Sequence, residues 1–261
     1  RGMDTAVITG ASMGLGEEFA RQLAARGENL VLTARSADRL DALAGELGPR
    51  HGVQVLTLPL DLAQPGAPAE VARFLDERGL RPKWLVNNAG FGEAGDFDSL
   101  DPKRLHDCVM LNAVALTDLT RLLVPAMRGV PGGARLINVA STAAFQPLAY
   151  FAVYAATKAF VLHLSEALHE ELRASGVRVT CLCPGPTRTQ FAANNGLAPE
   201  FFAAGQTAAE VVRRGLAASD RGRAVCITQS RLLVALSRLA PRAAVRKVAA
   251  AMARSLIKKP R

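Results

Sequence analysis

Short apolar runs alternate with longer stretches of mixed polarity along most of the chain. The apolar runs are rich in Val, Leu and Ile and predict strands at residues 6–9, 30–33, 53–58, 84–87, 135–140, 177–182 and 224–227. Helical patterns separate nearly all of them. Near-continuous apolar strands that alternate with helices form parallel sheets covered on both faces. The pattern therefore predicts an α/β fold, a single domain with a doubly wound, seven-stranded parallel sheet.

Several helix boundaries and one long loop can be predicted from residue type. Gly27 and Gly176 lie where the helices that begin near Leu15 and Phe151 should end. Thr207, with a glutamate three residues later, has the form of a capping box at a helix start. Residues 185–206 contain Pro, Asn and Phe without a clear period. A loop of that length is more often functional than idle, which predicts an irregular substrate lid.

The last thirty residues carry two apolar stripes at helical spacing. The first comprises Leu232, Leu233, Leu236 and Leu239, and the second, beyond Pro241, comprises Val245, Val248, Ala249, Met252 and Leu256. Two short amphipathic helices are predicted, as an extension (231–261) of the main domain (3–230). They could cover the substrate cleft or a subunit partner, which we favour, or anchor the protein on an anionic membrane surface.

Composition limits the class of protein. The 261 residues are 49% hydrophobic and 21% charged, enough for one large core in one globular domain. The four cysteines lack the paired spacing of a zinc site, which predicts a reduced, cytoplasmic protein without a metal. The first apolar run leads into a Gly-rich turn instead of a cleavage site, so no secretory signal is expected.

The net charge of +9 belongs to the C-terminal extension. Residues 231–261 hold nine Lys or Arg and no acidic residue, so the 23 remaining basic residues balance the 23 acidic ones. The tail could therefore bring a cytoplasmic enzyme to the inner face of the membrane. Aromatic residues make up 5% of the chain and no recognition motif is present, which argues against a nucleic-acid partner.

The first strand runs directly into a Gly-rich turn that opens a helix. Gly10, Gly14 and Gly16 let the backbone turn tightly and approach a pyrophosphate, which sits against the helix N-terminus. The alternative is a merely flexible turn. The second strand ends at Arg35 with no acidic residue at that point, which favours a 2′-phosphate and hence NADP(H), with NAD(H) as the second choice. Arg35 could instead only cap the sheet edge.

Tyr154 and Lys158 stand four residues apart on a predicted helix and therefore share one face. A cation beside a phenol favours the phenolate and makes the pair a proton-transfer device. Many helices carry such a pair by chance, so a surface Tyr and a solvated Lys is the alternative. The wider motif set decides between the two interpretations.

Taken together, the motifs resemble the short-chain dehydrogenase/reductase family over residues 5–227. They are, in order, the Gly turn at 9–16, Asp61-Leu62, Asn87 to Gly90, Ser141, Tyr154 with Lys158, and Pro184 to Thr189. The resemblance is greatest to a bacterial branch related to hydroxysteroid and ketoacyl reductases. It implies an NADP(H)-dependent oxidoreductase that transfers hydride between nicotinamide and a carbonyl or secondary alcohol. A catalytically silent NADPH-binding regulator or membrane-surface scaffold is the alternative.

The resemblance also implies catalytic roles. Tyr154 is expected to act as general acid or base, Lys158 to lower its pKa and bind the nicotinamide ribose, and Ser141 to hydrogen-bond the substrate oxygen. Asn112 matches the family's helix Asn, which holds a water in a proton relay, although it could simply bond to backbone.

The implied cofactor contacts are Gly10, Ser12, Gly14, Leu15, Gly16, Arg35, Asp61, Leu62, Asn88, Ala89, Gly90, Tyr154, Lys158, Pro184, Gly185, Thr187 and Thr189. Asp61 could instead be a plain turn residue, and the Asn pair a strand cap. The expected substrate contacts are Ser141, Phe145 and Phe191, and several further apolar residues surround the lid: Leu148, Phe151, Phe201 and Phe202. A lipophilic ketone or alcohol fits them, although the same side chains could be ordinary core. A homodimer or homotetramer is expected, through helices 103–127 and 151–175.

Overall fold

The protein is described by a computed structural model, which covers residues 2–254, apart from the side chains of Pro199 and Phe201. The strands are β1 (Met3–Thr9), β2 (Asn29–Ala34), β3 (Val55–Pro59), β4 (Leu80–Asn87), β5 (Ala134–Val139), β6 (Val177–Cys183), β7 (Thr187–Arg188), β8 (Gln206–Thr207) and β9 (Val225–Ile227). The helices are α1 (Gly14–Ala24), α2 (Ala37–His51), α3 (Ala67–Glu77), α4 (Pro102–Val109), α5 (Leu116–Met127), α6 (Ala152–Leu172), α7 (Phe191–Asn194), α8 (Pro199–Ala203), α9 (Ala208–Asp220), α10 (Arg231–Leu239) and α11 (Arg242–Arg254). A π-helical turn (Met110–Ala115) joins α4 to α5, and 3₁₀ turns lie at Phe97–Ser99, Thr142–Phe145 and Arg173–Ser175.

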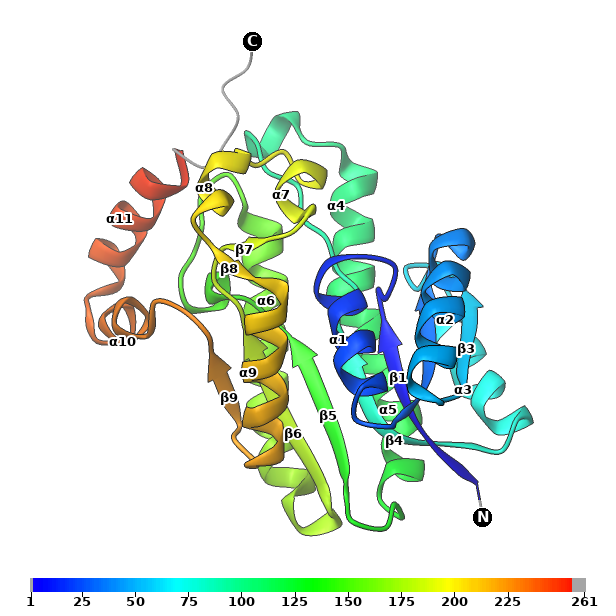
Figure 1. Cartoon of the computed structure of the whole chain (residues 1–261). Coiled ribbons are helices and arrows are strands. Elements are labelled where there is room, and N and C mark those ends of the chain that lie inside the picture. Colours follow the sequence, from blue (N-terminus) through cyan, green and yellow to red (C-terminus); the bar gives the residue numbers. More distant parts are fainter. Residues whose placement is uncertain (1, 255–261) are drawn as a thin grey trace.

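Seven strands form one parallel sheet in the order β3-β2-β1-β4-β5-β6-β9 (Figure 1). The order reverses between β1 and β4, which is the topological switch point where doubly wound sheets bind ligands. The predicted fold is confirmed. The strand boundaries differ from the prediction by a few residues, most at β4, which begins at Leu80 and not at Trp84.

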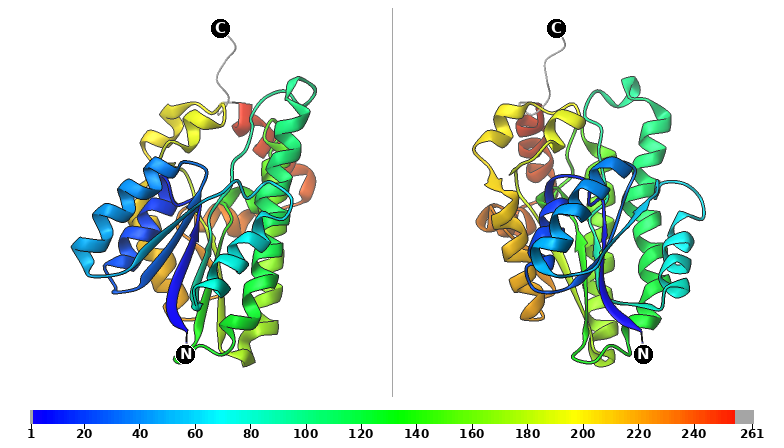
Figure 2. Two further views of the ribbon diagram at one scale, coloured as in Figure 1. Left: turned by 90° about the vertical axis from the view of Figure 1, so that its right-hand side faces the viewer. Right: turned by 45° about the vertical axis from the view of Figure 1, so that its right-hand side comes forward.

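Helices cover both faces of the sheet, as the turned views in Figure 2 show. Phe19 of α1, Leu40 of α2 and Val211 of α9 belong to one buried cluster. Val71 of α3 and Leu119 of α5 belong to the cluster on the other face. The strand side chains that these clusters enclose are apolar on both faces, which explains the near-continuous apolar runs of the sequence.

A buried hydrogen-bond network fixes the ends of the central strands. Asn87 at the end of β4 donates to Thr120 of α5 and to Asn138 of β5, both at 2.9 Å. Asn138 in turn donates to Ser165 of α6 at 3.0 Å. Because all four side chains are buried, the network orients α5 and α6 against the sheet at the end where the site lies.

The predicted helix ends are confirmed. Gly27 and Gly176 follow α1 and the last turn after α6 with φ of 77° and 79°, a backbone region that favours glycine. Thr207 and Glu210 form the reciprocal capping box of α9, which runs to Asp220. One stretch of the described chain, Pro102–Met127, is long and apolar enough to cross a membrane by length and composition. Half of its apolar window is buried, and Leu119 and Leu123 pack in the core, as in a core helix.

The prediction of an irregular lid was wrong in detail. Residues 185–206 contain the short helices α7 and α8 and end in β8, which pairs in parallel with β7. Leu197 and Ala192 are buried against Tyr154 and Phe151 of the main domain. The local sequence gave no clear period because each element is five residues or shorter, so their order depends on these tertiary contacts.

The two predicted C-terminal helices are present, as α10 and α11, beside the lid in Figure 1. In α11 Val245 and Ala249 of the predicted stripe are buried, whereas Val248 and Met252 are more than half exposed. In α10 all four leucines of the stripe are exposed, and the residue that packs against the protein is Val234. Leu256 and the three basic residues after it lie outside the described residues.

Candidate active site

A large cavity of about 1190 Å³ opens at the carboxyl ends of the central strands. It runs from Arg35 after β2, past the Gly turn, to Tyr154 and Lys158 on α6 and on to α10 and α11. All but three of the predicted site residues line it; the three are Gly16, Asn112 and Phe145.

The Gly turn has the shape that a pyrophosphate requires. Gly10 has φ of 65°, and a Cβ there would lie 2.9 Å from the backbone of Ala89. A Cβ on Gly16 would lie 2.1 Å from the Gly10 carbonyl oxygen, so only glycine lets α1 begin this close to the turn. No side chain caps the α1 N-terminus, and its first residues line the cavity. The backbone N–H groups of these first residues lie at the positive end of the helix dipole and suit an anion.

The far end of the cavity carries the residues expected around adenosine. Arg35 and Leu62 line it there. Asp61 also lines it, while its carboxylate accepts from the backbone N–H of Ala63 at 3.1 Å. Asp61 is therefore both a turn residue and a wall residue, the two interpretations that the sequence left open.

The segment after β4 is bound to the end of β1. Thr9 Oγ1 accepts the backbone N–H groups of Asn88 and Ala89 at 3.0 and 2.9 Å. The Asn88 amide donates to the carbonyls of Thr9 and Gly10. The Asn88 side chain is thus occupied in fixing the Gly turn, while Asn88, Ala89 and Gly90 line the cavity. Together with the open helix terminus, this arrangement fits a dinucleotide.

On the cavity wall beside Gly185, Gln229 offers a further polar atom. The Gln229 side chain lies against Gly185, where a Cβ would come within 2.9 Å of it. Its Oε1 atom is buried with no hydrogen-bond partner among the described residues, and Gln229 lines the cavity. Pro184, Thr187 and Thr189 line the same wall. An unpaired acceptor beside them suits a donor group on a bound molecule. Gln229 belongs to none of the sequence motifs and was not predicted.

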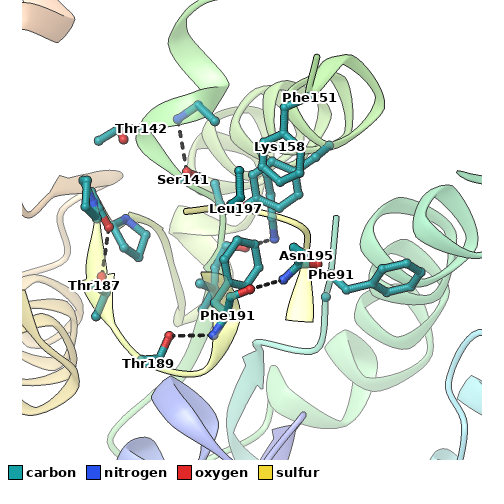
Figure 3. A pocket seen from close by; sticks show the side chains of 18 of the residues that line it. Phe91, Ser141, Thr142, Phe151, Lys158, Thr187, Thr189, Phe191, Asn195 and Leu197 are labelled. Atoms are coloured by element: carbon teal, nitrogen blue, oxygen red, sulfur yellow. Dashed lines mark hydrogen bonds between the residues drawn. The ribbon is translucent and has the colours of Figure 1, made fainter. Parts of the chain in front are cut away.

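Ser141, Tyr154 and Lys158 meet at the floor of the cavity. Ser141 follows β5, hydrogen-bonds the Tyr154 hydroxyl, and accepts the N–H of Ala143 at 3.1 Å. Lys158 donates to the Val139 carbonyl at 2.8 Å, and its Nζ atom lies 5.6 Å from the centre of the Tyr154 ring. Figure 3 shows Ser141 and Lys158 around this pocket. Tyr154 and Lys158 therefore share one face of α6, as predicted, and both side chains are buried.

Burial shifts both proton-transfer groups toward their neutral forms. Desolvation raises the pKa of Tyr154 above its usual value, while the hydrogen bond from Ser141 acts in the opposite direction. Desolvation lowers the pKa of Lys158 to about 8. In the protein alone, burial therefore outweighs the lowering of the Tyr154 pKa that was expected from Lys158.

Replacing Lys158 with methionine should alter how stability depends on pH. A free lysine has a pKa of about 10.4, so between pH 8 and pH 10 the unfolded chain holds more protons at this position than the folded chain. The wild type should therefore gain on the order of 2 kcal/mol of unfolding free energy over Lys158→Met across that interval. Urea denaturation of both proteins at several pH values measures the difference. Lys247→Met, at an exposed lysine, should show none, and a pH-independent difference for Lys158→Met contradicts the assignment.

Asn112 is occupied by protein groups. Its amide donates to the Phe91 carbonyl at 2.8 Å and to Thr157 Oγ1 at 3.0 Å, and its Oδ1 accepts the Phe91 N–H at 3.1 Å. It lies in the π-helical turn, which widens the helix at this point. The Asn112 side chain therefore anchors the segment after β4. Its contacts agree with the second interpretation of the sequence, an Asn that is bonded to backbone.

Phe145 is not a substrate contact. It is buried in a cluster with Leu116 and Val161, behind the cavity wall, and the Arg238 guanidinium of α10 lies 4.9 Å from its ring centre. The prediction failed because Phe145 ends the 3₁₀ turn after Ser141 and so points into the core. Phe191 does line the cavity, and its ring centre lies 5.5 Å from that of Tyr154.

Two residues that the sequence did not reveal hold the lid against the catalytic residues. Asn195, which is buried, accepts the Gly92 N–H at 2.6 Å and donates to the Phe191 carbonyl (Figure 3). A Cβ on Gly92 would lie 2.5 Å from the Phe151 ring, and that ring stacks on Tyr154 at 4.4 Å. A lone Asn in a loop and a Gly outside the motif carry no signal without the fold.

The fold and this site define an oxidoreductase of the dinucleotide-binding class, with a Ser, a Tyr and a Lys at the reacting end. Residues 4–199 match the sequence profile of the short chain dehydrogenase family, and the chain belongs to that family. It is 33% identical over 216 residues to an uncharacterized oxidoreductase of Myxococcus xanthus, covering 83% of this chain and 85% of the relative.

Two solved structures are similar over nearly the whole chain. A short-chain dehydrogenase from Sphingobium yanoikuyae in complex with NADPH is 35% identical, with a TM-score of 0.82 over 91% of this chain and 92% of that one. The bulky-bulky ketone specific alcohol dehydrogenase from Comamonas testosteroni is 32% identical, with a TM-score of 0.78 over 92% of this chain and 91% of that one.

Proposed function

We propose that the protein is an NADPH-dependent reductase of bulky, apolar ketones that also oxidises the corresponding secondary alcohols. The observation that carries the proposal is the group of Ser141 with the buried Tyr154 and Lys158, at the floor of one large cavity whose outer walls are apolar. NADP(H) is the preferred cofactor, with NAD(H) as the second choice. The Sphingobium yanoikuyae structure, which contains NADPH, supports this choice.

In this mechanism Tyr154 donates its proton to the ketone oxygen, and Ser141 hydrogen-bonds the same oxygen as negative charge develops on it. Bound NADPH supplies the hydride. Lys158, with its ammonium beside Tyr154, binds the ribose hydroxyls and stabilises the phenolate that remains. Because burial raises the pKa of Tyr154, the phenol is protonated at neutral pH, which suits reduction. Oxidation requires the phenolate and should accelerate as pH rises.

The walls on the substrate side favour large apolar groups. Leu148, Phe151 and Leu197 surround Tyr154, and the residues of α10 and α11 that line the cavity are apolar apart from Ser237. The charged residues that line the described cavity besides Lys158 are Arg35 and Asp61 at the adenosine end and Arg104 and Asp107 of α4. The side chain of Phe201 lies outside the described residues. The similarity to a bulky-bulky ketone specific enzyme supports the same substrate class.

A ketone panel tests the proposal. NADPH oxidation should be fastest with ketones that carry a large apolar group on each side of the carbonyl and slower with small or charged carbonyl compounds. Tight NADPH binding without turnover across the whole panel would contradict an enzymatic role.

Removing the charge of Arg35 should reverse or erase the cofactor preference. If Arg35 binds the 2′-phosphate, Arg35→Ala loses a charge-assisted hydrogen bond worth about 1.5–3 kcal/mol, which raises the NADPH Kd by about 10- to 100-fold. The NADH Kd should stay nearly constant. Fluorescence titration with both nucleotides measures the two values. Arg39→Ala, on the first turn of α2, serves as the matched control, and an equal loss for both nucleotides would contradict the assignment.

We also propose that the enzyme forms homodimers or homotetramers in the cytoplasm through α4, α5 and α6. Large apolar side chains are exposed on these helices, namely Val109, Leu122 and Phe160. Such a surface suits contact with a second copy. The described cysteines are all free and buried, as expected of a reduced compartment.

Replacing Phe160 with glutamate should break this association. Phe160 is 45% exposed on α6, and a carboxylate there would be desolvated in an interface. Light scattering after gel filtration should show a smaller particle for Phe160→Glu, with the wild-type helix content in circular dichroism. Phe97→Glu, at a more exposed Phe outside these helices, should keep the wild-type mass. An unchanged mass for Phe160→Glu places the interface elsewhere.

A further inference from the structure

The apolar face of α10 points away from the protein. Leu232 and Leu239 are 73% and 84% exposed, and Leu236 lies between them at helical spacing on the same face. Val234, on the opposite face, is 5% exposed and packs with Phe145 and Val161. The helix therefore packs on the domain through Val234 and presents its leucine stripe outward.

The segment that carries this stripe is basic. Arg238 points back to the body, over the Phe145 ring and 3.9 Å from Glu166, and so fixes the orientation of α10. Arg242, Arg246 and Lys247 on the adjoining α11 are exposed. No acidic residue occurs in residues 231–261 of the sequence. Exposed leucines on a segment whose charged residues are all basic are the composition of a helix that lies in a membrane interface.

We propose that α10 and α11 dock on a lipid bilayer that contains anionic lipids, with Leu232, Leu236 and Leu239 in the acyl boundary. Two observations argue against a second copy as the occupant. Symmetric pairing of these helices would bring two surfaces with only basic residues together. A nine-residue helix is also only about 14 Å long, and its outward face is far smaller than the roughly 800 Å² per partner of a stable interface.

The docked face is continuous with the substrate cavity. Leu233 and Leu236 of α10 and Val248 of α11 line the cavity and are also more than half exposed. A bilayer against α10 would therefore meet the apolar mouth of the cavity. This step rests on the proposed function: an apolar ketone dissolved in the bilayer would reach Tyr154 without crossing water.

Vesicle flotation tests the docking without any turnover. The full chain should float with vesicles of phosphatidylcholine and phosphatidylglycerol but not with pure phosphatidylcholine, and added salt should weaken binding. Leu232→Glu/Leu239→Glu should abolish flotation. Arg242→Gln/Arg246→Gln/Lys247→Gln should weaken binding about fivefold for each charge removed. Phe97→Glu, an exposed apolar residue outside the tail, should float like the wild type.

A second readout separates docking from catalysis. Leu232 and Leu239 do not line the cavity, so the double variant should reduce a water-soluble ketone at the wild-type rate. With a ketone confined to anionic vesicles, its KM should rise while kcat stays constant. Absence of wild-type flotation on anionic vesicles, or a fall in particle mass for the double variant in gel filtration, overturns the proposal. If the wild type showed no activity toward soluble ketones, the proposed function would be overturned instead.

Discussion

Tyr154→Phe is expected to lower the rate of ketone reduction by about 10²- to 10⁴-fold while leaving NADPH binding within a few-fold of the wild type. The substitution removes only the hydroxyl that donates the proton. Its ring keeps the stacking on Phe151 at 4.4 Å and the contact with Phe191. Single-turnover measurement of NADPH oxidation, together with nucleotide titration, separates the chemical step from binding.

Tyr150→Phe is the matched control, because the chain has only two tyrosines. The Tyr150 hydroxyl accepts from Arg254 at 3.0 Å, on the surface, and takes no part in the Ser141 group. Its loss should change turnover by less than a few-fold. Equal loss of activity in both variants, or wild-type turnover in Tyr154→Phe, would remove Tyr154 from the role of proton donor.

The fold could be predicted because its signals are local and repeated. Each central strand, such as Ala6 to Thr9, is apolar on both faces, and a parallel sheet covered by helices is the arrangement that buries both. Gly27, Gly176 and the capping box marked helix ends by backbone chemistry alone. The short elements within 185–206 could not be predicted, since they are held by contacts such as Leu197 against Tyr154 and not by their own periodicity.

The site was predicted where a motif fixes a backbone position and missed where tertiary packing decides. Ser141 follows β5 and Tyr154 lies on α6, so the topology brings them together at one sheet edge. Phe145 was placed in the site by composition, but its direction depends on the turn after Ser141 and on Arg238. Asn195 was missed because its partners, Gly92 and Phe191, are distant or unremarkable in sequence. The leucine stripe of α10 was expected to cover the substrate cleft or a subunit partner, but its four leucines are exposed, and the buried residue of the helix is Val234, outside the stripe.

Gly16→Ala is expected to be among the most damaging single-methyl changes in the protein. The added Cβ would lie 2.1 Å from the Gly10 carbonyl oxygen and 2.6 Å from the Asn88 amide nitrogen. The first obstacle is backbone, so the clash cannot be relieved by a side-chain rotation. The turn or the start of α1 must shift, at a cost of about 3 kcal/mol or more. We expect a fall in Tm of about 10 °C and loss of NADPH binding.

Gly45→Ala makes the same chemical change in an opposite context, which is why the two variants should be measured together. Gly45 lies within α2, is exposed, and a Cβ there meets nothing within 4 Å. Alanine at such a position should stabilise the helix by about 0.5–1 kcal/mol, with NADPH affinity unchanged. If Gly16→Ala melted within a degree or two of the wild type and still bound NADPH, the close approach of α1 to the Gly turn could not be what shapes the pyrophosphate site. If the added methyl group lowered Tm at Gly16 and raised it at Gly45, glycine would be required at position 16 because two backbone segments approach closely there, and not because the chain must be flexible.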